Sequence, residues 1–263
     1  MKYVKMLVPV LLLLIGAAVL AYPPISNYVN QKNSSYALQE LDRHLENVEE
    51  QEALHQRSLA QAYNARLLQG EEGEDYASVL DFGNGVMGAV EIPEINVSLP
   101  IYHGVSEEVL AKGVGHMPSS AFPIGGEGNH AVLTGHTGLP SAKLFTDLTK
   151  LQEGDVFHIR ILGESISYRV DQVKVVLPSE GEDLLPQPGK DYCTLLTCTP
   201  YGVNSHRLLV RGERVEEAQD EAITVMQTEP MKREIPWGVI AAVSFLVFCV
   251  SAGTAVWLLK RKR

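Results

Sequence analysis

The pattern of apolar and polar positions divides the N-terminal third of the chain into two parts. After Lys2 and Lys5, an apolar run at residues 6–22 is typical of a secretory h-region or a short signal anchor. The sequence Tyr-Pro-Pro at residues 22–24 predicts a helix break. Residues 34–68 contain neither Gly nor Pro, and their apolar side chains recur at helical spacing, which predicts one long or two shorter amphipathic helices. We expect this stripe to pack on the domain that follows, since the sustained heptads of a separate coiled coil are missing.

From about residue 81 the apolar period changes from helical to two, and Gly and Pro punctuate the chain. The alternation is clearest where Ile166, Tyr168 and Val170 are separated by polar residues. Such segments predict about seven or eight short strands and few helices, and hence a mainly β domain built as a small antiparallel or mixed barrel. The predicted strands are residues 86–92, 97–102, 131–133, 156–161, 166–173, 192–198 and 206–210, with a short helix at residues 107–112.

A second uncharged run, residues 237–259, precedes a basic tail at residues 260–263. At about 1.5 Å per residue the run is about 35 Å long, enough to span a membrane with some tilt. The basic tail keeps the C-terminus in the cytoplasm, so the barrel faces the cell exterior. The predicted order is a signal peptide or N-terminal signal anchor (1–30), a helical region with a short linker (31–80), the barrel (81–215), a polar linker (216–236), a transmembrane helix (237–259) and a cytoplasmic tail (260–263).

Composition and charge argue against nucleic-acid binding and against a metal or cofactor site. The formal net charge is −10, whereas a nucleic-acid binder needs a basic surface, so nucleic acid is not expected as a partner. No pair among the eight histidines has convincing metal-ligand spacing with a third ligand in support, and no Gly-rich phosphate loop occurs, so we expect no metal and no cofactor.

The three cysteines form no obvious disulfide framework. On one strand, Cys193 and Cys198 would lie about 17 Å apart, whereas a disulfide needs less than about 7 Å between Cα atoms. Cys249 lies in the C-terminal apolar run. Cys198 therefore has no evident partner, and a free thiol in an exported domain points to reactivity.

The candidate chemistry lies between residues 191 and 211. Two β-rich runs flank a loop with Pro200 and Gly202, which predicts a hairpin that sets Cys198 beside Arg207. A thiol and a guanidinium provide a nucleophile and a cation for the oxyanion, which acyl transfer needs. On the residues alone, this pairing is only suggestive.

Three further side chains near these segments have alternative interpretations. His136 closes a predicted strand inside a Gly-flanked turn, where a histidine is either displayed for function or bonded to local backbone. Cys193 is expected to be a small buried apolar residue. His206 should face away from Arg207 if the strand is regular, and so is expected to be structural.

Several motifs, in order and in register, resemble those of the sortases. Residues 194–198 read Thr-Leu-Leu-Thr-Cys, and Arg207 follows Cys198 nine positions later. The resemblance covers roughly residues 36–215 and is greatest to class C, the pilus-building branch. The other matching motifs are Gly-Asn-Gly-Val-Met-Gly at residues 83–88, Leu-Pro-Ile-Tyr-His-Gly at residues 99–104 and Leu-Thr-Gly-His-Thr-Gly-Leu-Pro at residues 133–140, which continues to Phe145.

The resemblance implies the eight-stranded sortase β-barrel, with N-terminal helices and flanking transmembrane helices. It implies a membrane-anchored cysteine transpeptidase in which Cys198 is the nucleophile, His136 the general acid and base, and Arg207 the stabiliser of the oxyanion. The implied substrate is a Leu-Pro-x-Thr-Gly-like sorting signal, cleaved between Thr and Gly through a thioester. The implied acceptor is a lysine amine of a pilin subunit, so that pili are polymerised on a Gram-positive cell.

Two alternatives remain open at this point. A membrane-tethered cysteine hydrolase would use the same Cys and His but finish with attack by water. A non-catalytic surface protein would also end in an apolar span and a basic tail. That protein would need a sorting pentapeptide just before the span, and Glu-Pro-Met-Lys-Arg at residues 229–233 does not supply one.

The chain departs from class C sortases in the segment before the barrel. Those enzymes commonly carry an Asp-Pro-aromatic lid, whose Asp meets the catalytic Arg and whose ring covers the Cys. No such tripeptide occurs here, and Asp75-Tyr76 lies so near residues 83–88 that Tyr76 is expected to lead into the barrel. We therefore predict a missing or vestigial lid and an accessible Cys198.

Overall fold

The computed structural model describes residues 4–71, 76–82, 85–216, 238 and 241, with backbone alone before Leu11. The chain divides into two compact units. One comprises residues 1–31, 140–142 and 233–263, and the other comprises residues 32–139 and 143–232. The predicted polar linker, C-terminal span and basic tail lie outside the described residues, apart from Glu216, Gly238 and Ala241.

The first helix, α1 (Val4–Asn47), begins in one unit and ends in the other. Its segment Leu11–Asn47 is long and apolar enough to cross a membrane, by length and composition. The predicted helix break at residues 22–24 is wrong, because α1 continues through both prolines. Each proline removes one backbone N–H donor from the helix.

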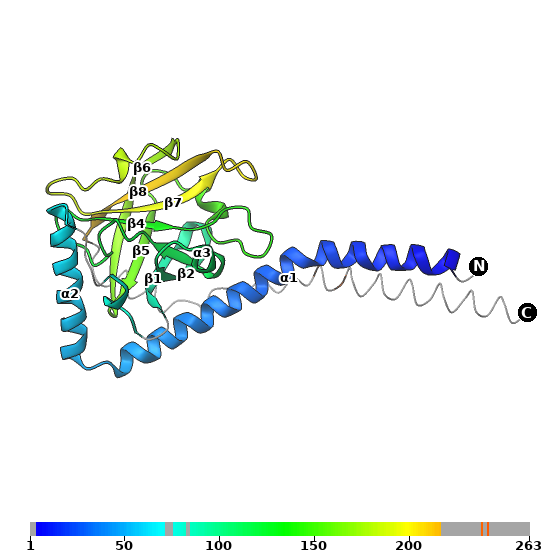
Figure 1. Ribbon diagram of the computed structural model, residues 1–263, viewed down its shortest axis with the longest axis horizontal. Helices are drawn as coiled ribbons and strands as arrows, with labels where there is room; N and C mark the ends of the chain where they lie inside the picture. The colour runs from blue at the N-terminus through cyan, green and yellow to red at the C-terminus, as the bar shows by residue number, and fades with distance from the viewer. Residues whose placement is uncertain (1–3, 72–75, 83–84, 217–237, 239–240, 242–263) are drawn as a thin grey trace, which may run out of the picture. The chain divides into compact units, whose positions relative to one another are not determined.

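The second helix, α2 (Glu50–Leu68), packs on the barrel through Ala60, Tyr63 and Asn64, which are all buried (Figure 1). The Asn64 amide donates to Phe122 O at 3.1 Å and accepts from Phe122 N at 2.7 Å. The Tyr63 hydroxyl donates to Pro118 O. The predicted packing of the apolar stripe is confirmed for Leu38, Leu41 and Tyr63, which are buried, whereas Leu54 and Ala62 are exposed. Of the two predicted arrangements, the structure has two helices.

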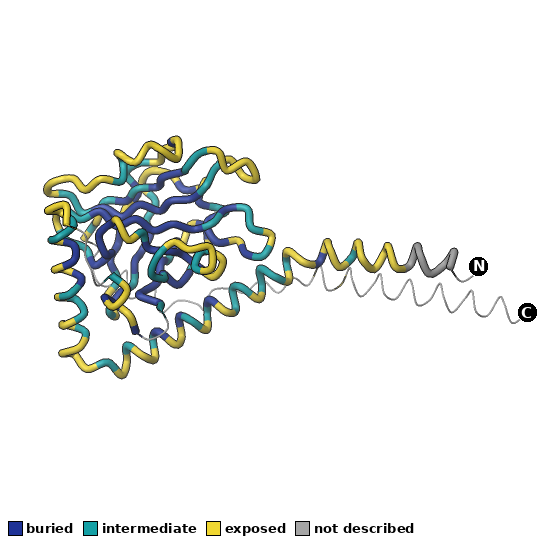
Figure 2. Tube along the Cα trace, in the orientation of Figure 1, coloured by how far each residue is buried: buried dark blue, intermediate teal, exposed yellow. Residues whose placement is uncertain are grey.

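Eight strands close into a barrel in the order β1-β2-β3-β4-β7-β8-β6-β5, which confirms the predicted mainly β barrel. Buried positions concentrate on these strands (Figure 2). The strands are β1 (Val86–Ile92), β2 (Val97–His103), β3 (Val114–His116), β4 (His130–Thr134), β5 (Val156–Ile161), β6 (Glu164–Val176), β7 (Tyr192–Thr199) and β8 (His206–Val215). The remaining helix is α3 (Glu107–Lys112), and short 3-10 turns are η1 (Tyr76–Ser78), η2 (Pro93–Ile95), η3 (Thr146–Lys150) and η4 (Glu182–Leu184). The sequence pattern missed β3, because three residues are too few to show a period of two.

Two strand pairings bring the candidate residues to one end of the barrel. Strand β4 runs parallel to β7, with Thr134 paired to Leu196. Their carboxyl ends therefore lie at the same edge, and the chain leaves β4 toward His136 where β7 reaches Cys198. Strands β7 and β8 form the predicted antiparallel hairpin.

Candidate active site

The β7–β8 register makes Cys198 and Arg207 direct cross-strand partners. Side chains of directly opposed residues on neighbouring strands project to the same face of a sheet. The thiol and the guanidinium therefore share one face of the hairpin, at the end next to the β7–β8 loop. Both residues are half-buried, so they are held by the fold and still reach solvent.

A cavity of about 350 Å³ unites these two residues with His136. The wall beyond them is largely apolar, and its polar members are Thr134, Glu107 and Glu180. The apolar lining side chains are Val105, Leu110, Met117, Val176, Leu177, Pro178, Leu184, Leu196 and Leu209. All three residues that the sequence nominated thus face the same cavity, together with several that it did not.

The turn that carries His136 is fixed to β7 by one backbone hydrogen bond and one side-chain hydrogen bond. Gly135 N donates to Leu196 O at 3.1 Å, and the Thr197 hydroxyl donates to Gly135 O at 2.7 Å. On the other side of the turn, Phe145 N donates to His136 O at 3.1 Å. A Cβ at Gly135 would lie only 2.8 Å from the Phe145 ring, so this close packing requires glycine. The histidine is therefore held between β7 and the segment around Phe145.

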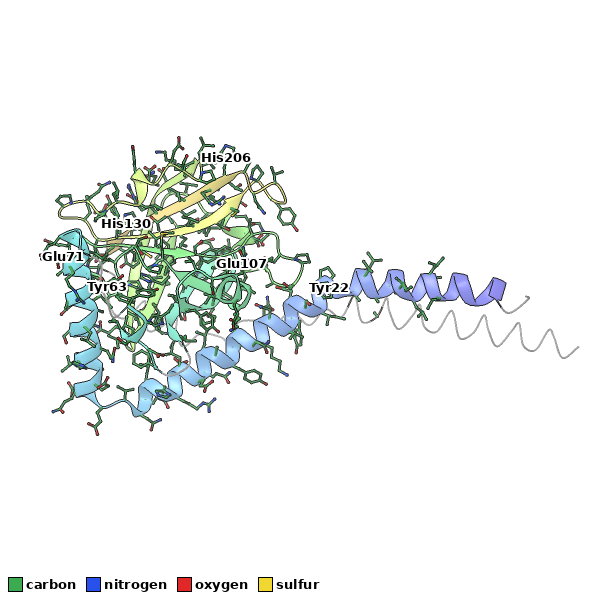
Figure 3. The ribbon with its side chains drawn as sticks, viewed as in Figure 1. Tyr22, Tyr63, Glu71, Glu107, His130 and His206 are labelled. Atoms are coloured by element: carbon green, nitrogen blue, oxygen red, sulfur yellow. The ribbon has the colours of Figure 1, made fainter. Side chains whose placement is uncertain are left out.

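The imidazole of His136 lies beside a carboxylate from α3. His136 Nε2 is 3.3 Å from Glu107 Oε2. The Glu107 side chain is 91% exposed, whereas that of His136 is 24% exposed. Figure 3 shows Glu107 on α3, at the edge of the barrel. The site therefore offers an imidazole with an acidic neighbour on its solvent side.

The β7–β8 loop positions the guanidinium of Arg207. Arg207 Nη1 donates to His206 O at 3.0 Å and to Asn204 O at 3.3 Å. Asn204 has a left-handed backbone (φ +58°), and its N–H donates to Pro200 O at 2.9 Å, which closes the loop. Within the part of the chain that the structure describes, Arg207 has no ion-pair partner, so its charge remains available to the cavity.

The same loop touches the histidine turn. A Cβ built on Gly138, whose φ is +73°, would lie 3.1 Å from Tyr201 Cε2, so the Tyr201 ring lies directly against this glycine. Gly138 N also donates to the Thr146 hydroxyl oxygen at 3.1 Å. The loops that follow Cys198 and His136 are therefore in contact.

The second thiol, Cys193, differs in its surroundings. It is fully buried within the barrel, and burial, with a smaller contribution from the charge of Asp191, raises the pKa of its thiol well above the usual value. The thiol of Cys193 therefore stays protonated and does not reach the cavity. The expectation that Cys193 is a buried apolar residue is confirmed.

The structure also places His206 away from the cavity. Its Nδ1 lies 2.9 Å from the Ser205 hydroxyl, and His206 is not among the residues that line the site. Figure 3 shows it near the start of β8. Among the described residues, no group of three or more His, Cys, Asp or Glu side chains is placed to hold a metal ion.

Comparison with known proteins identifies the family. The profile of the sortase domain matches residues 90–215. Sortase C1 from Streptococcus agalactiae superposes with a TM-score of 0.67 and 43% identity, over 70% of this chain and all of that chain. Sortase C from Clostridium perfringens, solved with the C-terminal cell wall sorting motif, gives a TM-score of 0.63 and 43% identity over the same shares. Sortase A from Bacillus anthracis is 27% identical over 80% of this chain and 93% of its own length.

The chain belongs to the sortase family. This sortase is a cysteine transpeptidase, and its solved relatives named above are sortases C, as the sequence motifs predicted. The cavity lined by Cys198, His136 and Arg207 therefore lies in a sortase barrel.

Tyr76, the first residue of η1, is not among the residues that line the cavity of this sortase. The Tyr76 hydroxyl lies 2.9 Å from His116 Nδ1, donates to His116 O and accepts from Gly104 N. The Tyr76 ring stacks on Phe122, with centroids 5.3 Å apart. The expectation that Tyr76 belongs to the segment leading into the barrel is confirmed. Asp75 lies outside the described residues, so the missing or vestigial lid stays a prediction.

Sequence reasoning missed two parts of the site. Nothing in the sequence around Glu107 ties it to His136, because the contact joins α3 to the β4 turn across 29 positions. The segment after β6 supplies Leu177, Pro178 and Leu184 to the wall of the cavity, although it reads only as an irregular connection. The short helix at residues 107–112 was predicted, but its position beside the histidine turn was not.

Proposed function

We propose that this sortase transfers a Leu-Pro-x-Thr-Gly-like sorting signal to an amine, with Cys198 as nucleophile, Arg207 as oxyanion stabiliser and His136 as general acid and base. The observation that carries the proposal is the joining of all three side chains in one cavity, with Cys198 and Arg207 paired across the hairpin. The buried and protonated state of Cys193 supports Cys198 as the reacting thiol.

The first half of the reaction forms the thioester. The Cys198 thiolate attacks the Thr carbonyl, and the negative charge that develops on its oxygen is stabilised by Arg207. Arg stays charged at any working pH and offers donors in a fixed fork, which suits this role. When the Thr–Gly bond breaks, imidazolium at His136 donates its proton to the departing Gly amine.

The apolar cavity wall supports a substrate that begins with Leu and Pro. Leu177, Pro178 and Leu184 come from the β6–β7 connection, and Leu196 and Leu209 from the barrel wall. Removing apolar surface from water favours binding at about 25 cal/mol per Å². The related sortase C from C. perfringens was solved with the C-terminal cell wall sorting motif, which supports this substrate class.

The second half of the reaction resolves the thioester with an amine. We propose that this amine is the side chain of a lysine on a pilin subunit, so that the product is an isopeptide bond and repeated cycles build a pilus. A solved relative described as a pilus-related sortase C of Group B Streptococcus supports this choice. A cysteine hydrolase would give the free Thr carboxylate in place of the amide.

We propose that the catalytic unit faces the cell exterior and that the basic tail at residues 260–263 stays inside. The apolar α1 segment supports membrane attachment, and the basic tail sets the orientation. Labelling of single cysteines in whole cells with an impermeant reagent tests this. A tail labelled in intact cells would overturn the orientation.

Product analysis tests the proposed reaction. The full-length protein in detergent is incubated with a fluorescent sorting-signal peptide, with and without a lysine-containing acceptor, and the products are separated by mass. The proposal predicts an amide product that requires the acceptor. Free acid alone, at every acceptor concentration, would establish the hydrolase.

A further inference from the structure

Glu107 is an exposed carboxylate at the cavity that contains the candidate catalytic residues. Its carboxylate lines the same cavity as Cys198, and its Oε2 is 3.3 Å from Nε2 of His136. Because its side chain is 91% exposed, the carboxylate can be reached from solvent. None of the steps that form the thioester uses this group.

Two other carboxylates near this edge, those of Glu180 and Glu108, already have partners. Glu180 also lines the cavity, but its Oε2 accepts the N–H of Leu177 at 2.8 Å and holds that turn. Glu108, the next residue on α3, forms an ion pair with Lys112 at 2.7 Å. Glu107 is thus the carboxylate whose interaction within the site is with the proton-transferring imidazole.

We propose that Glu107 binds the ammonium group of the acceptor and so favours lysine over uncharged nucleophiles. The inference rests on the proposed function, because it assigns the acceptor for the amine step of that reaction. The ligand is a primary ammonium ion on a flexible side chain.

The charge on His136 changes between the two halves of the proposed reaction, and this change leaves Glu107 able to bind a new cation before the amine step. In the proposed thioester-forming step His136 carries the proton, and its positive charge lies beside the Glu107 carboxylate. Once His136 has given its proton to the departing Gly amine, the imidazole beside Glu107 no longer carries a positive charge. A lysine ammonium then supplies the missing cation next to the base that must deprotonate it.

The amine step balances when both protons are followed. The bound ammonium loses one proton to water and a second to the imidazole of His136, while its nitrogen attacks the thioester carbonyl. The new C–N bond forms, the C–S bond breaks, and Cys198 leaves as thiolate. The positive charge next to Glu107 is on the lysine before this step and on His136 after it.

The test compares two amines of different charge. The full-length protein in detergent is given a sorting-signal peptide and either Nα-acetyl-lysine amide, which is cationic at neutral pH, or hydroxylamine, which is uncharged. For each protein the ratio of kcat/KM for lysine to kcat/KM for hydroxylamine is measured. Glu107→Gln keeps the size of the side chain and removes its charge, and Glu108→Gln is the matched control on the same helix.

We expect the lysine-to-hydroxylamine ratio to fall about three- to fivefold in Glu107→Gln, as for loss of an exposed ion pair. The ratio should stay within experimental error in Glu108→Gln. Added salt should lower the ratio in the wild type and have a smaller effect in Glu107→Gln, because the ion pair is screened. An unchanged ratio in Glu107→Gln, or an equal fall in Glu108→Gln, would overturn the proposal.

The design separates this inference from the proposed function. If Cys198 forms no thioester with the peptide, the proposed function itself fails. If the thioester forms and hydroxylamine resolves it, but Glu107→Gln leaves the ratio unchanged, only the role of Glu107 fails.

Discussion

Two histidines of this sortase show how differently the two sides of the barrel are built. On the side covered by α2, His116 is fully buried, with Nδ1 2.9 Å from the Tyr76 hydroxyl and Nε2 2.9 Å from Ala121 O. Its ring stacks on Phe122. Desolvation by burial lowers the pKa of His116 to about 4, so the ring stays neutral. Both of its nitrogens are committed to the fold.

On the cavity side, His136 keeps contact with solvent and with a carboxylate that is itself exposed. The two cysteines of β7 repeat the contrast, since Cys193 is buried in the barrel and Cys198 lies at the end of β7 next to the β7–β8 loop. The residue type is the same in each pair. The buried His116 and Cys193 are enclosed by the fold, whereas His136 and Cys198 can still contact solvent and a substrate.

The largest expected effect distinguishes the two thiols. Cys198→Ala should reduce amide product to the uncatalysed background, because the nucleophile is lost. Cys193→Ala should retain activity, although it opens a small space in the core that lowers stability. Product yield at saturating acceptor checks both. Substantial product from Cys198→Ala would break the contrast.

A second effect concerns the two other cavity residues. His136→Ala and Arg207→Ala should each lower kcat/KM by at least about 100-fold, as for loss of a general acid or of an oxyanion donor. Arg207→Lys should recover only part of the activity, because a lysine lacks the planar fork. Initial rates at several peptide concentrations measure this. Near-normal turnover in Arg207→Ala would exclude the oxyanion role.

A third effect concerns the buried histidine, His116, and the dependence of stability on pH. The unfolded chain binds a proton at His116 near pH 6.5, whereas the folded protein does so only near pH 4, so acidification favours unfolding. The stability that His116 contributes is complete above about pH 6.5 and is lost as the pH falls toward 4. Between pH 7.5 and 5 we expect a loss of about 2 kcal/mol from this residue.

Urea unfolding of the protein in detergent at pH 7.5 and at pH 5 measures this loss of unfolding free energy. His116→Gln should show a smaller change in unfolding free energy with pH than the wild type. Part of the dependence should remain, since burial also lowers the pKa of His130. An equally steep pH dependence in His116→Gln would show that the histidine is not the source.

The smallest expected effect concerns the contact between the two loops. Gly138→Ala places a Cβ 3.1 Å from the Tyr201 ring at a residue whose φ is +73°. We expect kcat to fall about five- to tenfold, because the histidine turn shifts relative to Cys198. Gly163→Ala is the matched control, since its φ is +77° and nothing lies within 4 Å of the added Cβ. Equal losses in both variants would assign the effect to backbone strain alone.

The sequence predicted those features that depend on local order. The alternation of Ile166, Tyr168 and Val170 predicted a strand, and the hairpin that pairs Cys198 with Arg207 followed from two β-rich runs and a short loop. The sortase motifs then nominated His136, which the structure places on the same cavity.

The features that were missed depend on contacts between distant segments. The approach of Glu107 to His136 exists only because α3 and the β4 turn meet at one end of the barrel. The helix that continues through Pro23 and Pro24 was missed because each proline alone favours a break. Local pattern therefore fixes strands and strand ends, whereas the cavity wall requires the closed barrel.

The most direct test of the account is the site of the covalent intermediate in the wild-type protein. The enzyme is incubated with a sorting-signal peptide without acceptor, quenched in acid, digested, and mapped by mass spectrometry. The account predicts an acyl group that ends in the Thr of the signal, attached to Cys198, with Cys193 unmodified. An acyl group on Cys193, or product formation with no acyl group on either cysteine, would contradict it.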